Sequence, residues 1–552
     1  MALAWAAALV VSGCGGGGGG ATTSPAAATG GGGGTTGGTG NGDTNSGGGA
    51  PSTPQARVEL QGTVSFEAVP TLADGGLDYA AQTRKPVRMV AIEAVDIGGK
   101  ILASGRTDGA GHYALSVPSP GSVKLRVLAR MFQDASAMAA PSAEVADNTE
   151  GDQVYAAVQE LFLIGSGALK HDLVIPSGWL ADGTTSVDTE RVAAPFAILD
   201  TIQTSQSKVL QAAPATVFPL LTVLWSEKNT PALPVNLAAG AIGTTHTRMV
   251  AGLPVMVLLG KKGVDTDEYD ASVISHEWAH YFQRTASRDD SPGGSHFSRD
   301  LLDRNLAFSE GWATAWSGIA LDSGRYTDSQ GDSASSSIVM DLTTPPAANK
   351  GWFNENSLWY VLRKLHDSDG LAPIVDAFKG SFRSVVASTG IHSFQASLAQ
   401  VAPKAAANLA PLLESQSISS AVDDAWAVRE TNNGGSAYAL PMYGQLAIGT
   451  PLQNLCVSNS LDPHSEGNKL GQIRYLRFSV TEPRFYQVQV TGPIDSDPDF
   501  SITNAKGTVV RGVTDSPAYQ SASAQLDAGD YLMAVRDYRH SSADTCFTVS
   551  IQ

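Results

Sequence analysis

The pentapeptide His-Glu-Trp-Ala-His at residues 276–280 constrains the fold of this chain more than its other motifs do. On an α-helix, two side chains four residues apart lie on one face, one turn from each other. His276 and His280 could then bind one zinc ion at roughly 2.0–2.1 Å. Glu277 directly follows the first histidine, so its carboxylate could act as a general base toward a water on that ion. The pentapeptide predicts a helix and a metal-dependent hydrolytic centre.

The residues around the pentapeptide also favour a helix. The stretch 265–270 supplies acidic residues suited to a helix N-cap and first turn. Apolar residues then recur at helical spacing, namely Val273, Ile274, Trp278, Tyr281 and Phe282. The alternative is a non-catalytic helix with two surface histidines. We favour the metal site because the chain has only 10 histidines among 552 residues.

A catalytic zinc ion needs a third protein ligand and an open position for water. The segment 308–314, Phe-Ser-Glu-Gly-Trp-Ala-Thr, resembles the Glu-Gly-aromatic-Ala segment that carries the third ligand in gluzincin peptidases. This resemblance implies that Glu310 is the third ligand. The separation from His280 is longer than in thermolysin-like enzymes, which implies an inserted loop at 287–299. Glu310 could instead be a surface acid or a structural ion-pair partner, with three rivals as ligand: His296, Asp300 and Asp303.

The resemblance to gluzincins implies a zinc-dependent metalloendopeptidase. Glu277 would take a proton from the attacking water and deliver it to the leaving amine. A further group should stabilise the oxyanion, and thermolysin-like enzymes use a Tyr and a His there. The segment 352–357 weakly resembles the one that carries this His, but Asn354 stands in its place. The candidates for the donor are His296, Tyr326, Tyr360 and His366.

We assign residues 190–435 to this metallopeptidase domain, an α+β fold that is mostly helical around the site. Periodicity predicts a helix over 193–209 and strands over 218–225 and 253–259. In the gluzincin fold a strand beside the cleft binds extended peptide by edge addition. Val255 to Leu259 is our candidate for that strand, and an ordinary buried strand is an equal alternative. Gly311 and Gly318 lower helix stability but allow close helix packing.

The start of the chain predicts export. An apolar run over residues 3–11 precedes Ser12-Gly13-Cys14, which resembles the lipobox of bacterial lipoproteins although a basic leader is missing. The resemblance implies a signal peptide over 1–14 and a lipid anchor on Cys14. Because Gly15, and not an aspartate, follows Cys14, the resemblance also implies the outer membrane or cell surface of a Gram-negative bacterium. A released form is the alternative. Residues 15–56 are rich in Gly, Ser and Thr and predict a flexible tether.

Two β-sandwiches are expected to flank the metal-binding domain. Over 57–131, apolar residues alternate with polar ones, and turn signals separate short strands. Gly62-Thr63-Val64 and the segment 107–115 resemble the carboxypeptidase regulatory-like domain. Residues 132–189 are expected to form a connector. Over 436–552 the period of two returns, and the segments 497–500 and 528–531 resemble the pre-peptidase C-terminal domain of secreted bacterial proteases.

Two cysteines remain once Cys14 is assigned to lipidation, and both lie in the C-terminal region. In an exported protein, Cys456 and Cys546 are expected to form one disulfide, with two buried free thiols as the alternative. Three alternating acids could bind calcium, although a solvated acidic turn is the preferred interpretation: Asp495, Asp497 and Asp499.

The net charge of the chain limits the classes of molecule that it is expected to bind. The formal net charge is −17, and no basic run occurs, so nucleic-acid binding is not expected. The expected partner is a protein or peptide substrate. Two further functions stay open. One is a zinc aminopeptidase, although residues 239–259 lack the Gly-x-Met-Glu-Asn segment of that group. The other is a non-catalytic surface binding or adhesion protein on a degenerate protease fold.

Overall fold

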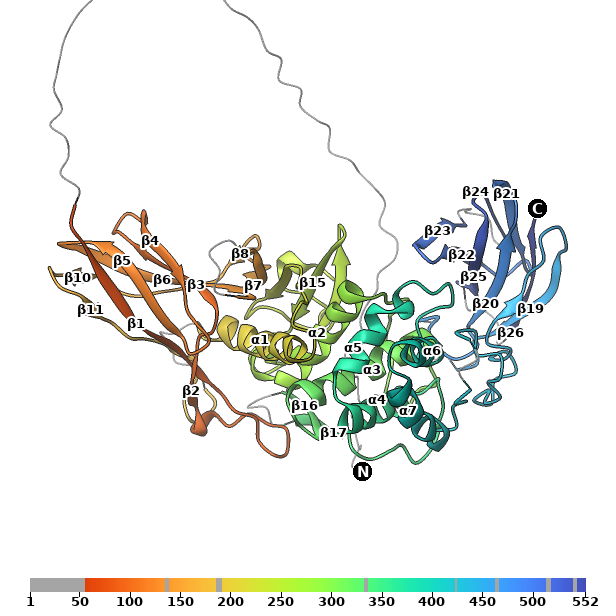
Figure 1. The fold of residues 1–552 in the computed structure, drawn as a ribbon, viewed down its shortest axis with the longest axis horizontal. Helices are drawn as coiled ribbons and strands as arrows, with labels where there is room; N and C mark the ends of the chain where they lie inside the picture. Colours follow the sequence, from red (N-terminus) through yellow and green to blue (C-terminus); the bar gives the residue numbers. More distant parts are fainter. Residues whose placement is uncertain are drawn as a thin grey trace, which may run out of the picture.

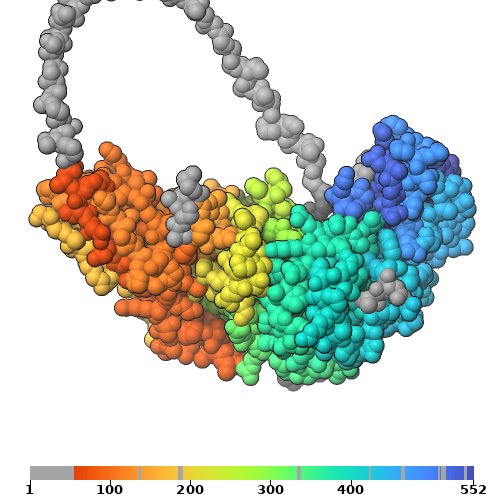
Figure 2. Space-filling model, viewed as in Figure 1, coloured from red at the N-terminus to blue at the C-terminus, as the bar shows by residue number. Residues whose placement is uncertain are grey.

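The computed structural model describes residues 55–134, 139–184, 191–331, 336–421, 424–461, 466–512, 518–539 and 544–552. The predicted lipobox with Cys14, and the tether apart from its last two residues, lie outside these ranges. A helical central part lies between two β-rich parts at opposite ends of the molecule (Figure 1). In the space-filling view the N-terminal and central parts form one continuous surface, and the C-terminal part forms a lobe at one end (Figure 2). None of the helices within the described ranges is long and apolar enough to cross a bilayer.

The N-terminal part contains a five-stranded sheet and most of a ten-stranded sheet. The five-stranded sheet consists of β1 (Arg57–Ala68), β2 (Thr83–Pro86), β5 (His112–Pro118), β11 (Leu169–Lys170) and β12 (Leu173–Ile175). The N-terminal strands of the larger sheet are β3 (Val90–Val95), β4 (Ile101–Arg106), β6 (Gly121–Phe132), β7 (Pro141–Asp147), β8 (Gln153–Val154), β9 (Ala156–Val158) and β10 (Phe162–Ile164). The alternation seen in the sequence has a structural cause, since from Val123 to Met131 every second residue of β6 is buried and the residues between them are only half-buried. The two sheets share apolar core residues.

The ten-stranded sheet continues into the central part of the molecule. It is completed by β13 (Leu221–Trp225), β14 (His246–Val250) and β15 (Leu253–Leu258). The strand β13 pairs in parallel with both β7 and β15, so the order is β14-β15-β13-β7-β6-β3-β4. Residues 132–189, expected to be a connector, therefore supply strands to both sheets. The N-terminal and central parts share one sheet and one hydrophobic core.

The position of β15 corrects one expectation. Residues 255–259 were our candidate for an edge strand that receives peptide, but β15 lies between β13 and β14. The backbone N–H and C=O groups of β15 are therefore hydrogen-bonded to a neighbouring strand on both sides. Among the described strands, β14 lies at one end of the strand order and β4 at the other, so β14 is an edge strand.

Seven α-helices and one hairpin form most of the rest of the central part in the described ranges, together with short 3-10 helices at Leu237–Ala239, Asp267–Tyr269 and Ser381–Arg383. The α-helices and the hairpin are α1 (Ala194–Ala212), α2 (Ala271–Ala286), α3 (Arg304–Ala320), α4 (Glu355–Asp369), α5 (Ala372–Lys379), α6 (Ile391–Val401), α7 (Pro403–Ser415), and the hairpin β16 (Arg325–Gln330) with β17 (Ser336–Asp341). Every residue of α3 is buried, so this helix forms the centre of the domain. A Cβ placed on Gly311 would lie 2.6 Å from Leu358 Cβ, which explains the glycine at the α3–α4 contact.

The C-terminal part is a sandwich of a five-stranded and a four-stranded sheet with its own hydrophobic core. The first sheet contains β18 (Gly444–Gln445), β20 (Ile473–Val480), β22 (Pro498–Asn504), β23 (Gly507–Arg511) and β25 (Gly529–Asp537). The second contains β19 (Leu452–Ser458), β21 (Arg484–Thr491), β24 (Tyr519–Leu526) and β26 (Asp544–Ile551). Cys456 on β19 and Cys546 on β26 form a disulfide, as the sequence predicts.

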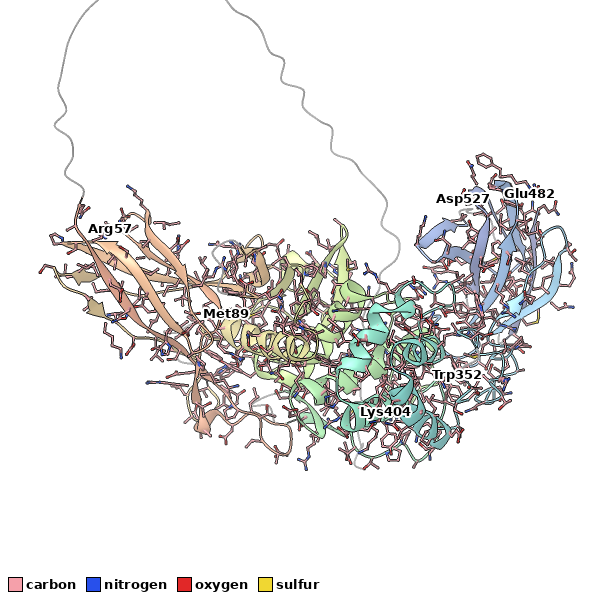
Figure 3. The ribbon with its side chains drawn as sticks, viewed as in Figure 1. Arg57, Met89, Trp352, Lys404, Glu482 and Asp527 are labelled. Atoms are coloured by element: carbon pink, nitrogen blue, oxygen red, sulfur yellow. A yellow bond between two sulfur atoms is a disulfide. The ribbon has the colours of Figure 1, made fainter. Side chains whose placement is uncertain are left out.

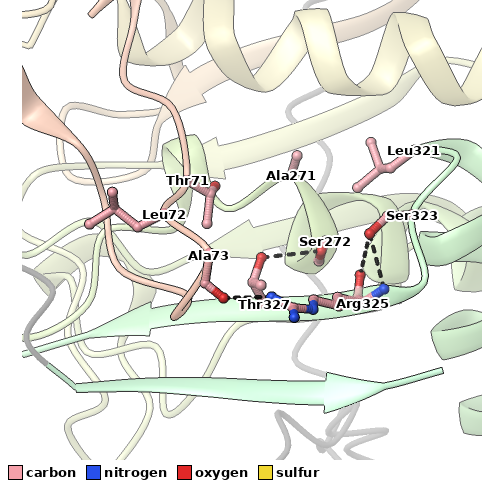
Figure 4. A pocket seen from close by; sticks show the side chains of 9 residues that line it. All are labelled: Thr71, Leu72, Ala73, Ala271, Ser272, Leu321, Ser323, Arg325 and Thr327. Atoms are coloured by element: carbon pink, nitrogen blue, oxygen red, sulfur yellow. Dashed lines mark hydrogen bonds between the residues drawn. The ribbon is translucent and has the colours of Figure 1, made fainter. Parts of the chain in front are cut away.

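Contacts at both ends hold the flanking parts against the central domain. The Nε1 of Trp352, labelled in Figure 3, donates to the carbonyl of Asn432 in the segment that leads to the C-terminal sandwich. At the other end, Arg325 Nη1 donates to the carbonyl of Ala73 in an N-terminal loop. This loop and the start of α2 line a cavity of about 230 Å³, with Ser272 and Thr327 on its wall (Figure 4). That cavity lies at the N-terminal end of α2 and its lining includes none of the predicted metal ligands.

Candidate metal centre

The helix α2 carries the pentapeptide, as its periodicity predicts. It spans Ala271–Ala286 and contains neither glycine nor proline. Its apolar face is buried, with Trp278 stacked on Phe282 at 5.4 Å between ring centroids. His276 and His280 lie one turn apart, and their Nε2 atoms are separated by 3.2 Å.

Glu310 reaches both histidines from the neighbouring helix α3. Asp303 caps this helix, and its side chain accepts a hydrogen bond from Asn305 N. Glu310 lies near the middle of the helix, and its Oε2 is 3.2 Å from His276 Nε2 and 3.5 Å from His280 Nε2. We call His276, His280 and Glu310 the metal triad.

The donor set and spacing of the metal triad suit a zinc ion. Bonds of roughly 2.0–2.2 Å in a tetrahedral arrangement place donor atoms about 3.3–3.6 Å apart. The triad distances of 3.2 Å, 3.2 Å and 3.5 Å lie close to this range. The Oε1 of Glu310 is buried and makes no hydrogen bond. The triad is at most 2% exposed, and burial alone would raise the pKa of Glu310, but His280 and His296 hold that pKa well below its usual value.

Ser309 orients His280. The Oγ of Ser309 donates to Asp289 Oδ2 over 3.3 Å and lies 3.0 Å from His280 Nδ1. Since the hydroxyl proton goes to Asp289, the oxygen accepts from a protonated Nδ1. That tautomer leaves the Nε2 lone pair of His280 for a metal. Asp289 is fixed in turn by Arg284 at 3.1 Å.

Glu277 lies fully buried beside the edge strand of the sheet. Its backbone carbonyl accepts a hydrogen bond from Thr247 Oγ1 on β14 at 3.0 Å. Several side chains lie close enough for Glu277 to affect their pKa values, among them Asp267, His246 and Tyr326. The pKa of His246 is lowered by burial, which Glu277 partly offsets, and that of Tyr326 is raised well above its usual value by burial and then by Asp328 and Glu277. Tyr326 also packs edge-on against His276, with 6.0 Å between ring centroids.

His296 is the one rival ligand that the structure brings to the triad. Its Nε2 lies 3.7 Å from Glu310 Oε2 and 3.2 Å from Glu355 Oε2, and the ring is buried. Burial alone would lower its pKa, but Glu310 and Glu355 raise it to about 9. His296 therefore lies beside the triad, on the Glu310 side.

The other candidates are engaged elsewhere. Asp300 lies 3.6 Å from Lys469 Nζ, and Asp303 caps α3. Asn354 caps α4 by accepting from Ser357 N at 3.1 Å. Tyr360 packs under Lys364, and His366 lies 3.8 Å from Asp367. The acids at 495–499 do not form a metal-binding group with other described residues, and Asp499 pairs with Arg536 at 3.3 Å.

Glu355 and His246 lie near the centre and are among the residues that were not identified from the sequence. Glu355 directly follows Asn354, where a histidine was sought, so a search for any titratable residue at 352–357 would have found it. His246 gave no such signal, because its position depends on β14 pairing with β15. The stretch 265–270 was expected to cap α2, but Asp270 occupies the N-cap without a side-chain hydrogen bond to the helix.

Comparisons with known proteins do not identify a family for this chain. No family model matches the chain, and no curated protein matches it. Solved structures that are similar to it over part of its length include the following three. One is the pre-peptidase C-terminal domain of collagenase from Bacillus anthracis, with 12% identity, 20% of this chain and 94% of that chain covered, and a TM-score of 0.16. The second is a 9R-lipoxygenase from Cyanothece PCC8801, with 13% identity, 30% and 26% covered, and a TM-score of 0.14.

The third is a cycloisomaltooligosaccharide glucanotransferase from Paenibacillus sp., with 7% identity, 88% and 72% covered, and a TM-score of 0.13. Scores this low carry no argument about fold or function.

Proposed function

We propose that this chain is a zinc-dependent metalloendopeptidase. The observation that supports it is the convergence of two imidazole nitrogens and one carboxylate oxygen within 3.5 Å of one another. Glu277 lies between the two histidines in the same helix and is not needed as a ligand. This division of roles, three ligands and one adjacent carboxylate, is what zinc-dependent hydrolysis requires.

The side chains around the triad suit peptide hydrolysis. A zinc ion bound there would supply a Lewis acid and lower the pKa of a water molecule. Glu277 would accept a proton from that water as it attacks the peptide carbonyl, and would pass the proton to the leaving amine. Of the four donors predicted from the sequence, His296 and Tyr326 are the two that lie near the triad and could donate to the oxyanion. Each lies beside a member of the triad.

The edge strand β14 offers a place for the substrate. Among the described strands it pairs only with β15, so its other edge can accept an extended peptide by β-addition. Thr247 on this strand is bonded to the backbone of Glu277. A peptide aligned along β14 would therefore lie close to the general base. We propose β14 in place of β15 as the substrate strand.

Digestion of denatured casein and a library of internally quenched peptides tests this proposal. Half of the peptides should carry blocked N-termini, because an endopeptidase cleaves these and an aminopeptidase does not. We expect cleavage of both sets, loss of cleavage with a zinc chelator, and recovery when zinc is restored. Cleavage confined to free N-termini would favour the aminopeptidase.

The burial of the metal centre also fits a competing function, that of a non-catalytic protein in which zinc is structural. Glu277 and all three triad residues are buried, and the loop before α3 is fixed by Asn468 Nδ2, which donates to the carbonyl of Gly293 at 2.9 Å. A non-catalytic surface protein that uses zinc for structure would have such a closed site. Bound zinc without cleavage of any peptide in the same assay would support that function.

We also propose that the chain is an exported lipoprotein, on the motif that ends at Cys14. A radioactive fatty acid should label the wild type and not Cys14→Ser. An unlabelled wild type that stays in the cytosol with its first residues intact would contradict export.

A further inference from the structure

Four aspartates form a second group of converging carboxylates outside the metal triad. Asp265, Asp267 and Asp270 lie in the stretch that leads into α2, and Asp328 comes from β16. One oxygen from each lies within 4.8 Å of the others. Their exposed fractions are 9%, 2%, 0% and 3% in chain order. We call these residues the aspartate cluster.

Three of its oxygens are buried and make no hydrogen bond. These are the Oδ1 atoms of Asp265, Asp270 and Asp328. In Asp270 and Asp328 the second oxygen is held by a neutral donor, since Asp270 Oδ2 accepts from Ser329 Oγ at 2.6 Å and Asp328 Oδ2 from Gln330 Nε2 at 3.1 Å. These two carboxylates are therefore oriented by the protein, with one oxygen of each left for a ligand. Buried polar atoms without partners are rare in folded proteins and call for such an explanation.

The position of Asp270 at the start of α2 is a second sign that its carboxylate is directed toward a ligand. It is the N-cap residue of α2, where an aspartate normally accepts a hydrogen bond from the first turn. Its side chain makes no such bond. Its carboxylate instead faces the aspartate cluster.

Within the described residues no basic side chain compensates this charge. None of the four aspartates makes an ion pair within 4.0 Å, and the nearby Arg191 pairs with Glu268 instead. An isolated carboxylate is very costly to bury without a counter-charge. Burial and mutual repulsion accordingly raise the pKa values of Asp270 and Asp328 well above their usual range. A bound cation removes this penalty.

We propose that the aspartate cluster is a calcium site. Calcium binds six to eight oxygen atoms at about 2.3–2.6 Å, so two ligands on opposite sides of the ion can lie up to about 5.2 Å apart. One oxygen from each aspartate lies within 4.8 Å of the others, which is inside that span. Magnesium usually keeps several of its waters and is held by one or two carboxylates, so four converging protein carboxylates favour calcium. Zinc prefers nitrogen and sulfur ligands, which the cluster lacks.

The site has a structural consequence for the metal triad. Asp270 directly precedes α2, and Asp328 lies in the same strand as Tyr326. A calcium ion would join the start of α2 to β16 and so fix the helix that carries His276. The calcium site does not depend on the proposed function, because none of its ligands belongs to the triad.

Thermal unfolding and calcium binding by the full-length chain test the site. Protein stripped with EDTA is titrated with calcium, magnesium or zinc chloride, and bound calcium is counted by equilibrium dialysis with radioactive calcium. We expect one calcium per chain and, at about 100 times the Kd, a rise in Tm of roughly 5–10 °C. His276→Ala should keep this response. That variant separates failure of the calcium site from failure of the zinc proposal.

Asp270→Asn with Asp328→Asn should abolish both the bound calcium and the rise in Tm. The matched control, Asp497→Asn with Asp499→Asn, should keep both. If the double variant in the cluster does not fold, Asp265→Asn at its rim should still weaken calcium binding at least tenfold. The site would be overturned if the wild type bound no calcium. It would also be overturned if the Asp497→Asn, Asp499→Asn control lost the bound calcium and the rise in Tm while the cluster variant kept both. An equal rise in Tm with magnesium would overturn the assignment to calcium.

Discussion

The Oγ of Ser309 lies 3.0 Å from Nδ1 of His280 and so links the two helices of the metal triad. Ser309 precedes the third ligand in the chain, so one short segment supplies both a ligand and the group that orients another. Partners of this kind typically contribute 10- to 100-fold to metal affinity or activity.

Ser309→Ala should therefore weaken zinc binding by about 10- to 100-fold, because His280 loses the acceptor for its Nδ1 proton. Competition with a zinc-chelating dye measures the affinity. Ser317→Ala is the matched control, since Ser317 is buried in the same helix and donates to the Thr314 carbonyl instead. Equal zinc affinity in both variants would contradict the orienting role.

Glu310→Gln should weaken zinc binding beyond the range expected for an orienting partner, because it replaces a charged ligand. Glu355→Gln makes the same change to a buried residue that faces His296 but is not in the triad. Elemental analysis after gel filtration should find zinc in the second variant and little in the first. Full zinc retention by Glu310→Gln would place the third ligand elsewhere.

His296→Ala and Tyr326→Phe test the oxyanion donors. Removal of a donor that acts in the transition state should lower kcat by about 100- to 1,000-fold while zinc stays bound. His366→Ala is the control, because His366 contacts Asp367 on α4. Steady-state kinetics on one quenched peptide would distinguish the two residues. Wild-type kcat in both variants would show that neither is the donor.

Gly311→Ala tests the packing of α3 on α4. Alanine favours a helix by about 1 kcal/mol relative to glycine. The new Cβ would nevertheless lie 2.6 Å from Leu358 Cβ, so we expect a net loss of about 1–3 kcal/mol in the free energy of unfolding. Gly109→Ala, where no atom lies within 4 Å of the new Cβ, should change it by less than about 0.5 kcal/mol. Urea unfolding measures both, and an equally small change in the two variants would contradict the close packing.

Local sequence patterns predicted the elements that carry the metal triad. The helical spacing of His276 and His280 and the surroundings of Glu310 depend on residues close in sequence, and α2 and α3 are found where these patterns place them. The disulfide was predictable because only two cysteines remained after Cys14. A pre-peptidase C-terminal domain also occurs among the structural neighbours, at a score too low to identify the fold.

Features that depend on distant pairing were not predictable in this way. The parallel pairing of β7 with β13 joins two expected domains into one sheet, and no local pattern encodes it. The strand β15 is interior because it pairs with β13 and with β14, which leaves β14 at an edge of the sheet. The acids before α2 were interpreted as helix caps because capping is a local role. Their convergence with Asp328 requires the hairpin β16–β17 to fold against them.

Glu277→Gln provides the most direct test of the proposed chemistry. Glutamine keeps the size of the side chain but cannot accept the proton, and Glu277 is not a ligand. Zinc content and Tm should therefore match the wild type while kcat falls by about 100- to 10,000-fold. Glu482→Gln, on the exposed loop labelled in Figure 3, should change none of these. His276→Ala should lose zinc and activity together. Peptide cleavage by Glu277→Gln at the wild-type rate, with zinc bound, would contradict Glu277 as the general base.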